Sequence, residues 1–468
     1  MTMLMTILSF LVTIGVLVVI HEYGHYRAAV ACNVKVLRFS VGFGQVLWRR
    51  QRGETEFVIS ALPLGGYVKM LDEREGPVDE AEQDRAFNRK PLLQRAFVVA
   101  AGPLANLLLA VLLYAGVNWA GVQELRPWLA QPRVDTLAHE AGLQSQDEVV
   151  GLEMLNTDGG SDEGHQHTVR SMTDLQWLFI QAAMAGQDVR LQVETHAQES
   201  GPVAGRRSVV LHLSRIPPAE VDGRLLDRVG FSGPYAEPLI AEVVQGGPAD
   251  KAGLRAGDRV LQVNGVAPAD AGQLRQMIRD SQNDGVAQAL SLHIERAGQA
   301  IPVQILPVMT DIKGQRVPRI EAALGSIPAT VEVSYGLVEG LTKAATKTWD
   351  VSVMSLSMLG KMLMGEASLQ NLSGPLTIAD YAGRSAQMGW VYYLGFLALV
   401  SVSLGVLNLL PLPVLDGGHL MYYLFEGVTG RPVSDIWLER LQRGGIAIML
   451  AMMSLALYND LARLFGAP

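Results

Sequence analysis

The sequence predicts a multi-domain membrane protein in which four helices cross the bilayer and a soluble region separates the first pair from the second. The chain has 468 residues, and hydrophobic residues make up 49% of it against 18% for charged ones. Long uncharged runs stand near both ends, whereas residues 122–310 have the mixed charge and frequent turn residues of soluble domains. A chain of this length is expected to fold as two or more domains.

Four uncharged apolar stretches are the candidate spans: residues 1–20, 96–123, 385–415 and 444–459. A spanning helix needs about 20 mostly apolar residues, so the first three are long enough and the fourth is short. The first run has no basic start and no Ala-x-Ala exit. We therefore expect it to stay in the protein rather than to act as a cleaved signal peptide.

Basic residues set the predicted orientation. Lysines and arginines are frequent between residues 26 and 95 and occur again between 416 and 443, whereas none precedes the first span. Because short loops rich in Lys and Arg stay in the cytoplasm, we expect both termini and the middle region outside, which in a bacterium is the periplasm. The net charge of -8 argues against a nucleic-acid partner. The single cysteine, Cys32, excludes an internal disulfide and a cysteine metal site.

The motif His21-Glu22-Tyr23-Gly24-His25 ends the first apolar run. Helical spacing places His21 and His25 on one face, one turn apart, where two imidazoles can bind one zinc ion. Glu22 lies beside them and can take a proton from a water on that ion. Ionisable groups at the edge of a span are costly, which favours a functional role. A pair of histidines satisfied within a packed core is the alternative.

Asp416 is the expected third ligand. It follows the third apolar run, and the predicted orientation brings it to the same cytoplasmic depth as His21 and His25. Zinc in hydrolases takes three protein ligands and leaves a fourth position for water. His419 is a rival ligand, and a polar turn residue after a helix is the alternative reading of Asp416.

Residues 34–70 are expected to form strands rather than helix. Residues 34–41 alternate in polarity, and strand-like runs follow at 56–60 and 64–70 with glycines between them. An apolar hairpin beside an embedded site could lend its edge to an extended substrate. An ordinary small sheet on the cytoplasmic surface explains the pattern equally well.

The middle region contains a weak repeat. Ala141-Gly142-Leu143 recurs as Ala252-Gly253-Leu254, and Asp147 recurs at the same spacing as Asp258. The second copy, which continues to an Asn264-Gly265 turn, resembles a bacterial PDZ domain. PDZ domains bind peptide ends by strand addition, with backbone N–H groups holding the carboxylate.

Peptide termini are expected to bind the second copy. Its candidate carboxylate loop consists of Val229, Gly230, Phe231 and Ser232. The first copy is degenerate, since Gln146 stands where the second has Gly257 and no comparable loop is evident.

An amphipathic helix is expected between residues 331 and 364, where apolar residues recur near helical spacing. It is too polar to span, so it fits the outer membrane interface, with a plain packing helix as the alternative. The chain then divides into five parts: residues 1–121 with two spans, the histidine motif and the membrane-associated β region, 122–215 and 222–310 as two PDZ-like α+β domains, 328–366 as the interfacial helix region, and 385–468 with the last two spans.

The whole pattern resembles the site-2 protease family of intramembrane metalloproteases. The resemblance is carried by the motif from His21 to His25, the tandem repeats, and the run from Asn408 to Gly418. Further matching segments are Gly42-Phe43-Gly44, Ala101-Gly102-Pro103 and Asn371-Leu372-Ser373-Gly374-Pro375.

The resemblance implies an intramembrane zinc endopeptidase in the bacterial inner membrane. One zinc ion per chain would be bound by His21, His25 and Asp416, with Glu22 as the general base. It also implies substrate contacts at Gly42, Phe43, Gly44, Leu64, Gly65, Gly66, Tyr67, Asn408, Pro411 and Pro413.

The implied substrates are single-span membrane proteins already shortened outside the cell membrane, notably of the anti-sigma factor class, and remnant signal peptides. Their cleavage would activate an envelope stress response, and the PDZ-like pair would exclude uncut substrates by size. One alternative is a membrane-anchored PDZ scaffold whose metal motif is inert. Another is a zinc peptidase that acts on soluble peptides.

Overall fold

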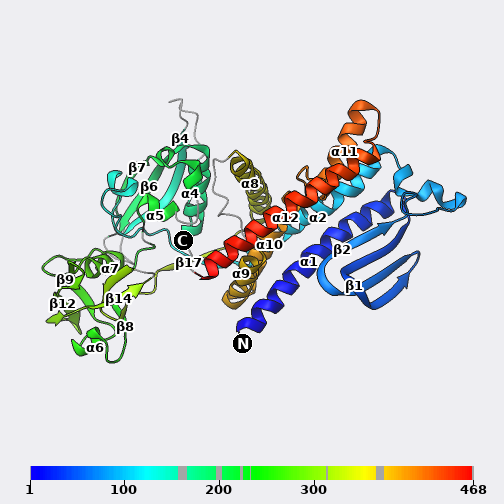
Figure 1. The fold of residues 1–468 in the computed structure, drawn as a ribbon. Helices are drawn as coiled ribbons and strands as arrows, with labels where there is room; N and C mark the ends of the chain where they lie inside the picture. Colours follow the sequence, from blue (N-terminus) through cyan, green and yellow to red (C-terminus); the bar gives the residue numbers. More distant parts are fainter. Residues whose placement is uncertain are drawn as a thin grey trace. The chain divides into compact units, whose positions relative to one another are not determined.

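A computed structural model describes residues 2–155, 166–196, 203–221, 225–231, 233–312, 315–364 and 374–465. The chain forms two compact units, each described here by itself. The first unit comprises Met1–Val122, Ser334–Met364 and Leu369–Pro468, and the second comprises Gln123–Val333. The soluble middle of the sequence is therefore an insertion between the two halves of an apolar helical unit (Figure 1).

The first unit is mainly helical. Its helices are α1 (Thr2–Ala31), α2 (Leu92–Ala120), α8 (Leu337–Leu363), α9 (Pro375–Met388), α10 (Trp390–Asn408), α11 (Asp416–Thr429) and α12 (Asp435–Phe465), with short 3-10 turns at Glu80–Arg85 and Phe87–Arg89. Within the described residues, four helices are long and apolar enough to cross a membrane: Met3–Ala31, Leu92–Ala120, Trp390–Asn408 and Ile436–Ala462. The predicted number of spans is confirmed.

Two predicted helix starts are wrong, at residues 385 and 331, whereas the end of the third span at the prolines was expected. The third run, 385–415, is divided at Gly389, whose φ of 129° suits glycine and separates α9 from α10. The same run stops being helical after Asn408, because the following prolines cannot continue the backbone hydrogen bonds. The helix expected from residue 331 begins at Leu337, since Thr330–Val333 forms strand β17.

Helix α2 is the centre of the helical unit, since α1, α8, α10 and α11 all pack against it. The crossing with α1 is very close: a Cβ at Gly24 would overlap the backbone oxygen of Ala101 and lie 2.8 Å from the Ala105 Cβ. The crossing with α10 is also close, because a Cβ at Gly405 would lie 3.1 Å from the Pro103 oxygen. Glycines at both contacts let helix backbones approach where lipid gives no hydrophobic driving force.

The predicted β region consists of two long antiparallel strands, β1 (Val36–Arg52) and β2 (Thr55–Met70). Both strands bend, so that residues 38–41 of β1 pair with both ends of β2. The register gives four segments in the order 46–52, 55–60, 36–41 and 66–70. The bend in β1 occurs at Gly42 and Gly44, whose φ values of 89° and 85° are natural for glycine. Segment 66–70 is consequently an edge of this sheet (Figure 1).

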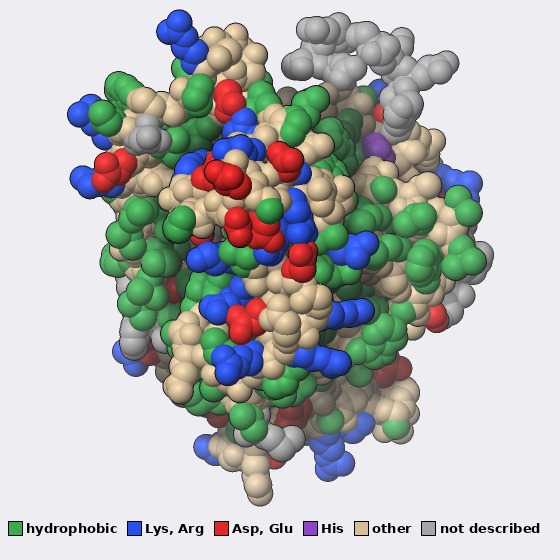
Figure 2. Space-filling view, turned by 90° about the vertical axis from the view of Figure 1, so that its right-hand side faces the viewer, with side chains coloured by type: hydrophobic (Ala, Val, Ile, Leu, Met, Phe, Trp, Pro, Cys, Tyr) green, Lys and Arg blue, Asp and Glu red, His purple; other side chains and the backbone are tan. Residues whose placement is uncertain are grey.

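The segment between the sheet and α2 carries many charged side chains. Ion pairs join Arg89 to Glu73 at 2.9 Å and Arg74 to Asp72 at 2.6 Å. Figure 2 shows acidic and basic side chains mixed across the middle of one face of the molecule, with apolar side chains around them. The segment between the sheet and α2 thus carries ion pairs of opposite charge.

The second unit contains two apolar cores, each built on one copy of the repeat. Elements around the first core are α3 (Leu137–Glu140), β4 (Asp147–Leu155), β5 (His167–Thr168), α4 (Met172–Ala185), β6 (Asp188–His196), β7 (Val203–Leu211) and α5 (Leu225–Val229). Elements around the second are β8 (Ile240–Val243), α6 (Pro248–Lys251), β9 (Arg259–Val263), α7 (Ala271–Arg279), β12 (Leu290–Arg296), β13 (Gln299–Ile305) and β16 (Ala322–Leu324). The sheet orders are β5-β4-β6-β7 and β13-β12-β9.

Shorter elements complete this unit. They are β3 (Val122–Leu125), which pairs with β17, the pairs β10 (Gln282–Asn283) with β11 (Val286–Ala287) and β14 (Val308–Ile312) with β15 (Gln315–Arg319), and 3-10 turns at Leu213–Arg215 and Pro218–Glu220.

The repeat seen in the sequence has a matching local structure in both copies. Each copy has a one-turn helix followed after one residue by Gly142 or Gly253, with φ values of 76° and 79°, and the next residue is a leucine that is 2% exposed. The backbone is left-handed at Gln146 as well as at Gly257, so the glutamine adopts a conformation that glycine takes without strain. The two copies therefore share a turn even where their residues differ.

The expected carboxylate loop does not belong to the second copy. Val229 and Phe231 are buried in the first core, and Tyr235 donates to the Trp128 oxygen, so the chain is still attached to the first copy. The N–H groups of Gly230 and Phe231 both donate to the oxygen of Leu226. The placement of this loop is corrected: its apolar residues complete the first core, and these two N–H groups end α5. Ser232 lies outside the described residues.

The boundary between the copies moves for the same reason. The first core includes buried residues up to Phe231, and the second runs from Ile240 to Ile320. The copies therefore meet after Phe231, rather than between residues 215 and 222.

Asp258 links the turn of the second copy to its sheet. Its carboxylate is 1% exposed, and both of its oxygens accept from Arg296 at 2.7 Å. Burial would raise the pKa of Asp258, but the bonds from Arg296 and from the Arg255 N–H outweigh burial and hold the pKa below its usual value. The ionised Asp258 therefore stabilises the folded second copy at any pH above 3.8, the usual pKa of the carboxyl in the unfolded chain. This stabilisation is lost as the pH falls through the lower pKa of the folded state.

Asp258→Asn is expected to loosen the second copy at neutral pH. Hydrogen bonds to charged groups contribute about 1.5–3 kcal/mol, so amide exchange in β9 and β12 of the full chain should accelerate about tenfold or more. The exposed Asp284→Asn, which removes the same charge from the same copy, should exchange like the wild type. Equal protection in both variants would contradict this role of Asp258.

Candidate metal centre

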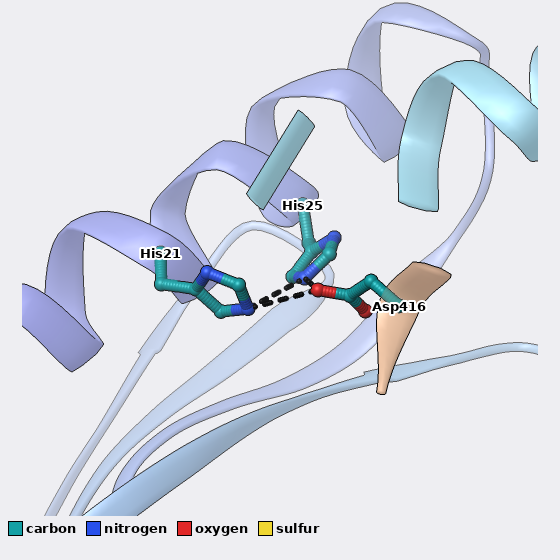
Figure 3. Close-up of side chains that lie close together, drawn as sticks. All are labelled: His21, His25 and Asp416. Carbon is teal, nitrogen blue, oxygen red and sulfur yellow. Dashed lines mark hydrogen bonds and ion pairs between the residues drawn. The ribbon is translucent and has the colours of Figure 1, made fainter. Parts of the chain in front are cut away.

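Three side chains from opposite ends of the sequence meet in the helical unit (Figure 3). His21 and His25 lie one turn apart on α1, and Asp416 is the first residue of α11. The Asp416 Oδ2 lies 3.1 Å from the His21 Nε2 and 3.5 Å from the His25 Nε2. The two Nε2 atoms are 3.2 Å apart, and the ring planes are nearly perpendicular at 86°. These atoms could all be ligands of one metal ion.

The hydrogen bonding of His25 supports a metal site. Its Nδ1 lies 2.9 Å from the Val98 oxygen, which can only accept, so this nitrogen carries the proton and donates. The Nε2 lone pair then points at the Asp416 carboxylate and the other imidazole. A carboxylate and a lone pair facing each other at this distance repel, and a proton or a metal ion between them relieves that repulsion. Two nitrogens and one oxygen suit zinc and leave a fourth position for water.

Helix α2 makes room for the imidazoles at Gly102. A Cβ there would overlap the His25 Nε2 and lie 2.9 Å from the His21 Cε1. One turn further along α2, the amide Nδ2 of the fully buried Asn106 lies 3.3 Å from the His21 Nδ1. In the sequence, Gly102 was identified only within the matching segment Ala101-Gly102-Pro103, and no role was assigned to Asn106. Their four-residue spacing, which puts both on one face of a span, is the signal that could have revealed them.

Two glycines after Asp416 let its carboxylate reach α1. A Cβ at Gly417 would overlap the Leu410 oxygen, and one at Gly418 would lie 2.7 Å from the Leu412 carbonyl carbon. The loop before α11 thus folds directly onto the first turn of that helix. The Gly418 N–H donates to the Leu415 oxygen at 3.0 Å and fixes the turn.

An open cavity of about 1010 Å³ lies beside the three side chains. Glu22 lines it, together with Gly66 and Tyr67 from the edge segment of the sheet. The sheet edge and Glu22 are in close contact, because a Cβ at Gly66 would lie 3.0 Å from the Glu22 Cγ. His419, the rival ligand, lines the same cavity but is outside the group of converging ligand atoms found among the described residues.

The two glycine-containing segments expected to contact substrate lie against each other. The Phe43 ring stacks on Tyr67 with centroids 6.1 Å apart, and a Cβ at Gly65 would lie 3.1 Å from the Phe43 Cζ. Gly42 and Gly44 are the bend of β1 on either side of Phe43. Leu64 lies in β2, and its side chain is outside the described part of the structure.

The residues expected at the end of the third span have other surroundings than the cavity. Asn408 ends α10, Pro411 is exposed, and Pro413 packs against Gly445 of α12, where a Cβ would lie 3.1 Å from the proline ring. None of these three is among the described residues that line the cavity.

Comparison with known proteins gives one family. The model of peptidase family M50 matches residues 9–452. A protein named as a zinc metalloprotease from Ralstonia nicotianae is 42% identical, with 99% of this chain and 100% of that protein covered. Protease RseP from Yersinia pestis is 38% identical over 99% of this chain and 100% of its own. Regulator of sigma-E protease RseP from Escherichia coli K12 is 38% identical over 97% and 98%.

Gly102→Ala is expected to disturb the metal centre without disturbing α2 elsewhere. The added methyl group would collide with the His25 ring, so zinc affinity should fall by about tenfold or more. Zinc titration of the purified full chain measures this. Gly116→Ala on the same helix, where a Cβ meets nothing within 4 Å, is the matched control and should bind zinc like the wild type. Equal affinities in the two variants would refute the steric role of Gly102.

Proposed function

Because the chain belongs to peptidase family M50, the site-2 protease family of intramembrane zinc metalloproteases, we propose that His21, His25 and Asp416 bind its catalytic zinc ion. The observation that carries this proposal is the approach of the Asp416 carboxylate to both Nε2 atoms, at 3.1 and 3.5 Å. Nothing local in the sequence brings these residues together. The bound ion supplies Lewis acidity, which polarises a carbonyl and makes water acidic near neutral pH.

Glu22 is the proposed general base. Its side chain lines the same cavity as His21 and His25, so a water or a peptide carbonyl bound there faces all three side chains. Glu22 takes the proton of the attacking water and later delivers it to the leaving amine nitrogen. Peptide hydrolysis is the reaction that this pair of roles serves.

The edge segment 66–70 is the proposed holder of the scissile peptide. A transmembrane substrate hides its amides in helical hydrogen bonds, so it must unwind before hydrolysis. An edge strand offers replacement backbone partners by strand addition. The contact of Gly66 with Glu22 brings this edge to the catalytic carboxylate, and Phe43 on Tyr67 supports it from the bend of β1.

The outer boundary of the substrate cleft is proposed at Asn408, Pro411 and Pro413. Backbone that is not helical is tolerated at membrane depth only where it faces protein or a cavity. The loop between α10 and α11 contains Pro411 and Pro413, and it leads directly into Asp416.

The physiological role follows from the relatives. Several are named regulator of sigma-E protease, so we propose regulated intramembrane proteolysis of single-span proteins of the anti-sigma factor class, with remnant signal peptides as further substrates. The enzyme would lie in the bacterial inner membrane with both termini outside the cytoplasm. This orientation rests on the basic loops described above.

The two copies in the middle unit are proposed as periplasmic PDZ-like domains that exclude substrates whose outer part has not been removed. Peptide termini are proposed to bind the second copy. Strand β16 lies beside α7 there, since a Cβ at Gly325 would lie 3.1 Å from the Ala271 Cβ. A sheet edge next to a helix is the geometry that strand addition uses.

Glu22→Gln is expected to keep zinc and lose cleavage by about 10²–10⁴-fold, because the amide cannot accept a proton. The measurement pairs zinc content with cleavage of a membrane-embedded substrate. Glu75→Gln removes the same charge from another part of the cavity wall and should cut normally. Membrane proteins that accumulate with the Glu22→Gln form identify the substrates. Cleavage by this form at the wild-type rate would remove the assignment.

Disulfide trapping tests the edge segment. In a Cys32→Ala background, Tyr67→Cys should crosslink to a cysteine placed near the scissile bond of a substrate, because Tyr67 lines the cavity. Trp48→Cys lies in the segment at the opposite edge of the same sheet and is the control that should not crosslink. Equal crosslinking at both positions would argue against substrate addition at segment 66–70.

A further inference from the structure

Asn106 is a buried polar residue that the hydrolytic mechanism does not use. Its side chain is 0% exposed in the middle of α2. The amide Nδ2 lies 3.3 Å from the His21 Nδ1, while the Oδ1 has no hydrogen-bond partner among the described residues. A buried carbonyl without a donor costs about 1–3 kcal/mol, so it needs a reason.

The chemistry of His21 supplies that reason. Its Nε2 faces Asp416 and His25, so a metal ion there binds the Nε2 lone pair. A neutral imidazole bound through Nε2 must carry its proton on Nδ1, and that N–H needs an acceptor. The atom of Asn106 drawn next to it is a donor. A half turn of the amide exchanges its nitrogen and oxygen, which are nearly equal in size and fit the same space.

We propose that Asn106 is a positioning residue for zinc binding: its Oδ1 accepts the Nδ1–H of His21 and holds that ring with Nε2 toward the metal. This rests on the proposed function of the His21, His25 and Asp416 group. One amide serves both states, because it donates to Nδ1 in the metal-free ring and accepts from Nδ1–H in the metal-bound ring. The otherwise orphaned Oδ1 then has a partner when zinc is present.

The backbone of Asn106 is held independently of its side chain. Ser401 on α10 is also 0% exposed, and its Oγ donates to the Asn106 backbone oxygen at 2.7 Å. His25 has the corresponding support from the Val98 oxygen, also on α2. Helix α2 thus presents one acceptor to the Nδ1 of each zinc-binding imidazole, one from its backbone and one from a side chain.

The test compares three variants of the full chain in detergent. Asn106→Leu keeps the shape of the side chain without a polar atom, and its zinc affinity, measured by competition with a chelator, should fall about 10–100-fold. Asn106→Asp keeps an acceptor for Nδ1–H and should bind zinc as the wild type does or more tightly. Ser401→Ala removes a hydrogen bond of the same site but not the contact with His21, and its affinity should be unchanged.

Thermal unfolding distinguishes positioning from simple packing. The expected result is that Asn106→Leu reduces the rise in Tm on zinc addition more than it reduces the Tm of the metal-free protein. Wild-type zinc affinity in Asn106→Leu, or a tenfold loss in Asn106→Asp, would overturn the proposal.

A second measurement tests the proposal on the wild-type protein, in case Asn106→Leu does not fold. Nitrogen-15 NMR of zinc-loaded wild-type protein should show His21 protonated at Nδ1 in a hydrogen bond, and an Nε2-protonated ring would overturn the inference. The proposed function fails separately, if His21→Ala binds zinc as tightly as the wild type.

Discussion

The metal centre depends on the close approach of α2 to α1. Gly24 and Gly102 leave no side chain between the two helices at this crossing. The backbone of α1 at Gly24 therefore contacts the backbone of α2, and the imidazoles of α1 contact the α2 backbone at Gly102. Any added carbon would separate the helices, and both groups that contact the histidine Nδ1 atoms, the Val98 oxygen and the Asn106 amide, lie on α2. Within a bilayer such contacts rely on close packing, because lipid is as apolar as the side chains that it would replace.

The converging ligand atoms explain why this packing is tolerated. Two imidazoles and a carboxylate at 3.1–3.5 Å come from two distant helices, α1 and α11, although each group alone would prefer water. The proposed zinc ion would satisfy all three at once, and its binding energy would then add to the stability of the folded helical unit. The glycines after Asp416 serve the same end, since they let the loop before α11 fold onto its first turn and direct the carboxylate to α1.

The bent sheet adds a second kind of complementarity. Two strands make four segments because β1 and β2 fold back at glycines, and the edge at 66–70 results from that bend. This edge contacts the side chain of Glu22, so the proposed substrate strand and the proposed general base face the same cavity. Separate regions of the first unit therefore contribute the ligands, the carboxylate and the strand to one open space.

The sequence by itself determined the features that depend on local period and length. The four spans follow from apolar runs, the spacing of His21 and His25 from the helical repeat, and the strands from alternation and glycine positions. Asp416 was also predicted to meet the histidines, because the basic loops predict a common depth for both ends of the chain, and the structure groups it with them. A repeated turn in the middle region was evident for the same local reason.

Only the tertiary structure decided the rest. It divided the third run at Gly389, assigned Val229 and Phe231 to the first core, and brought Gly102 and Asn106 against the histidines. Each of these depends on which distant residue occupies the neighbouring space. A local pattern records that a residue is small, apolar or polar, but the contact that uses this property exists only once the helices have packed.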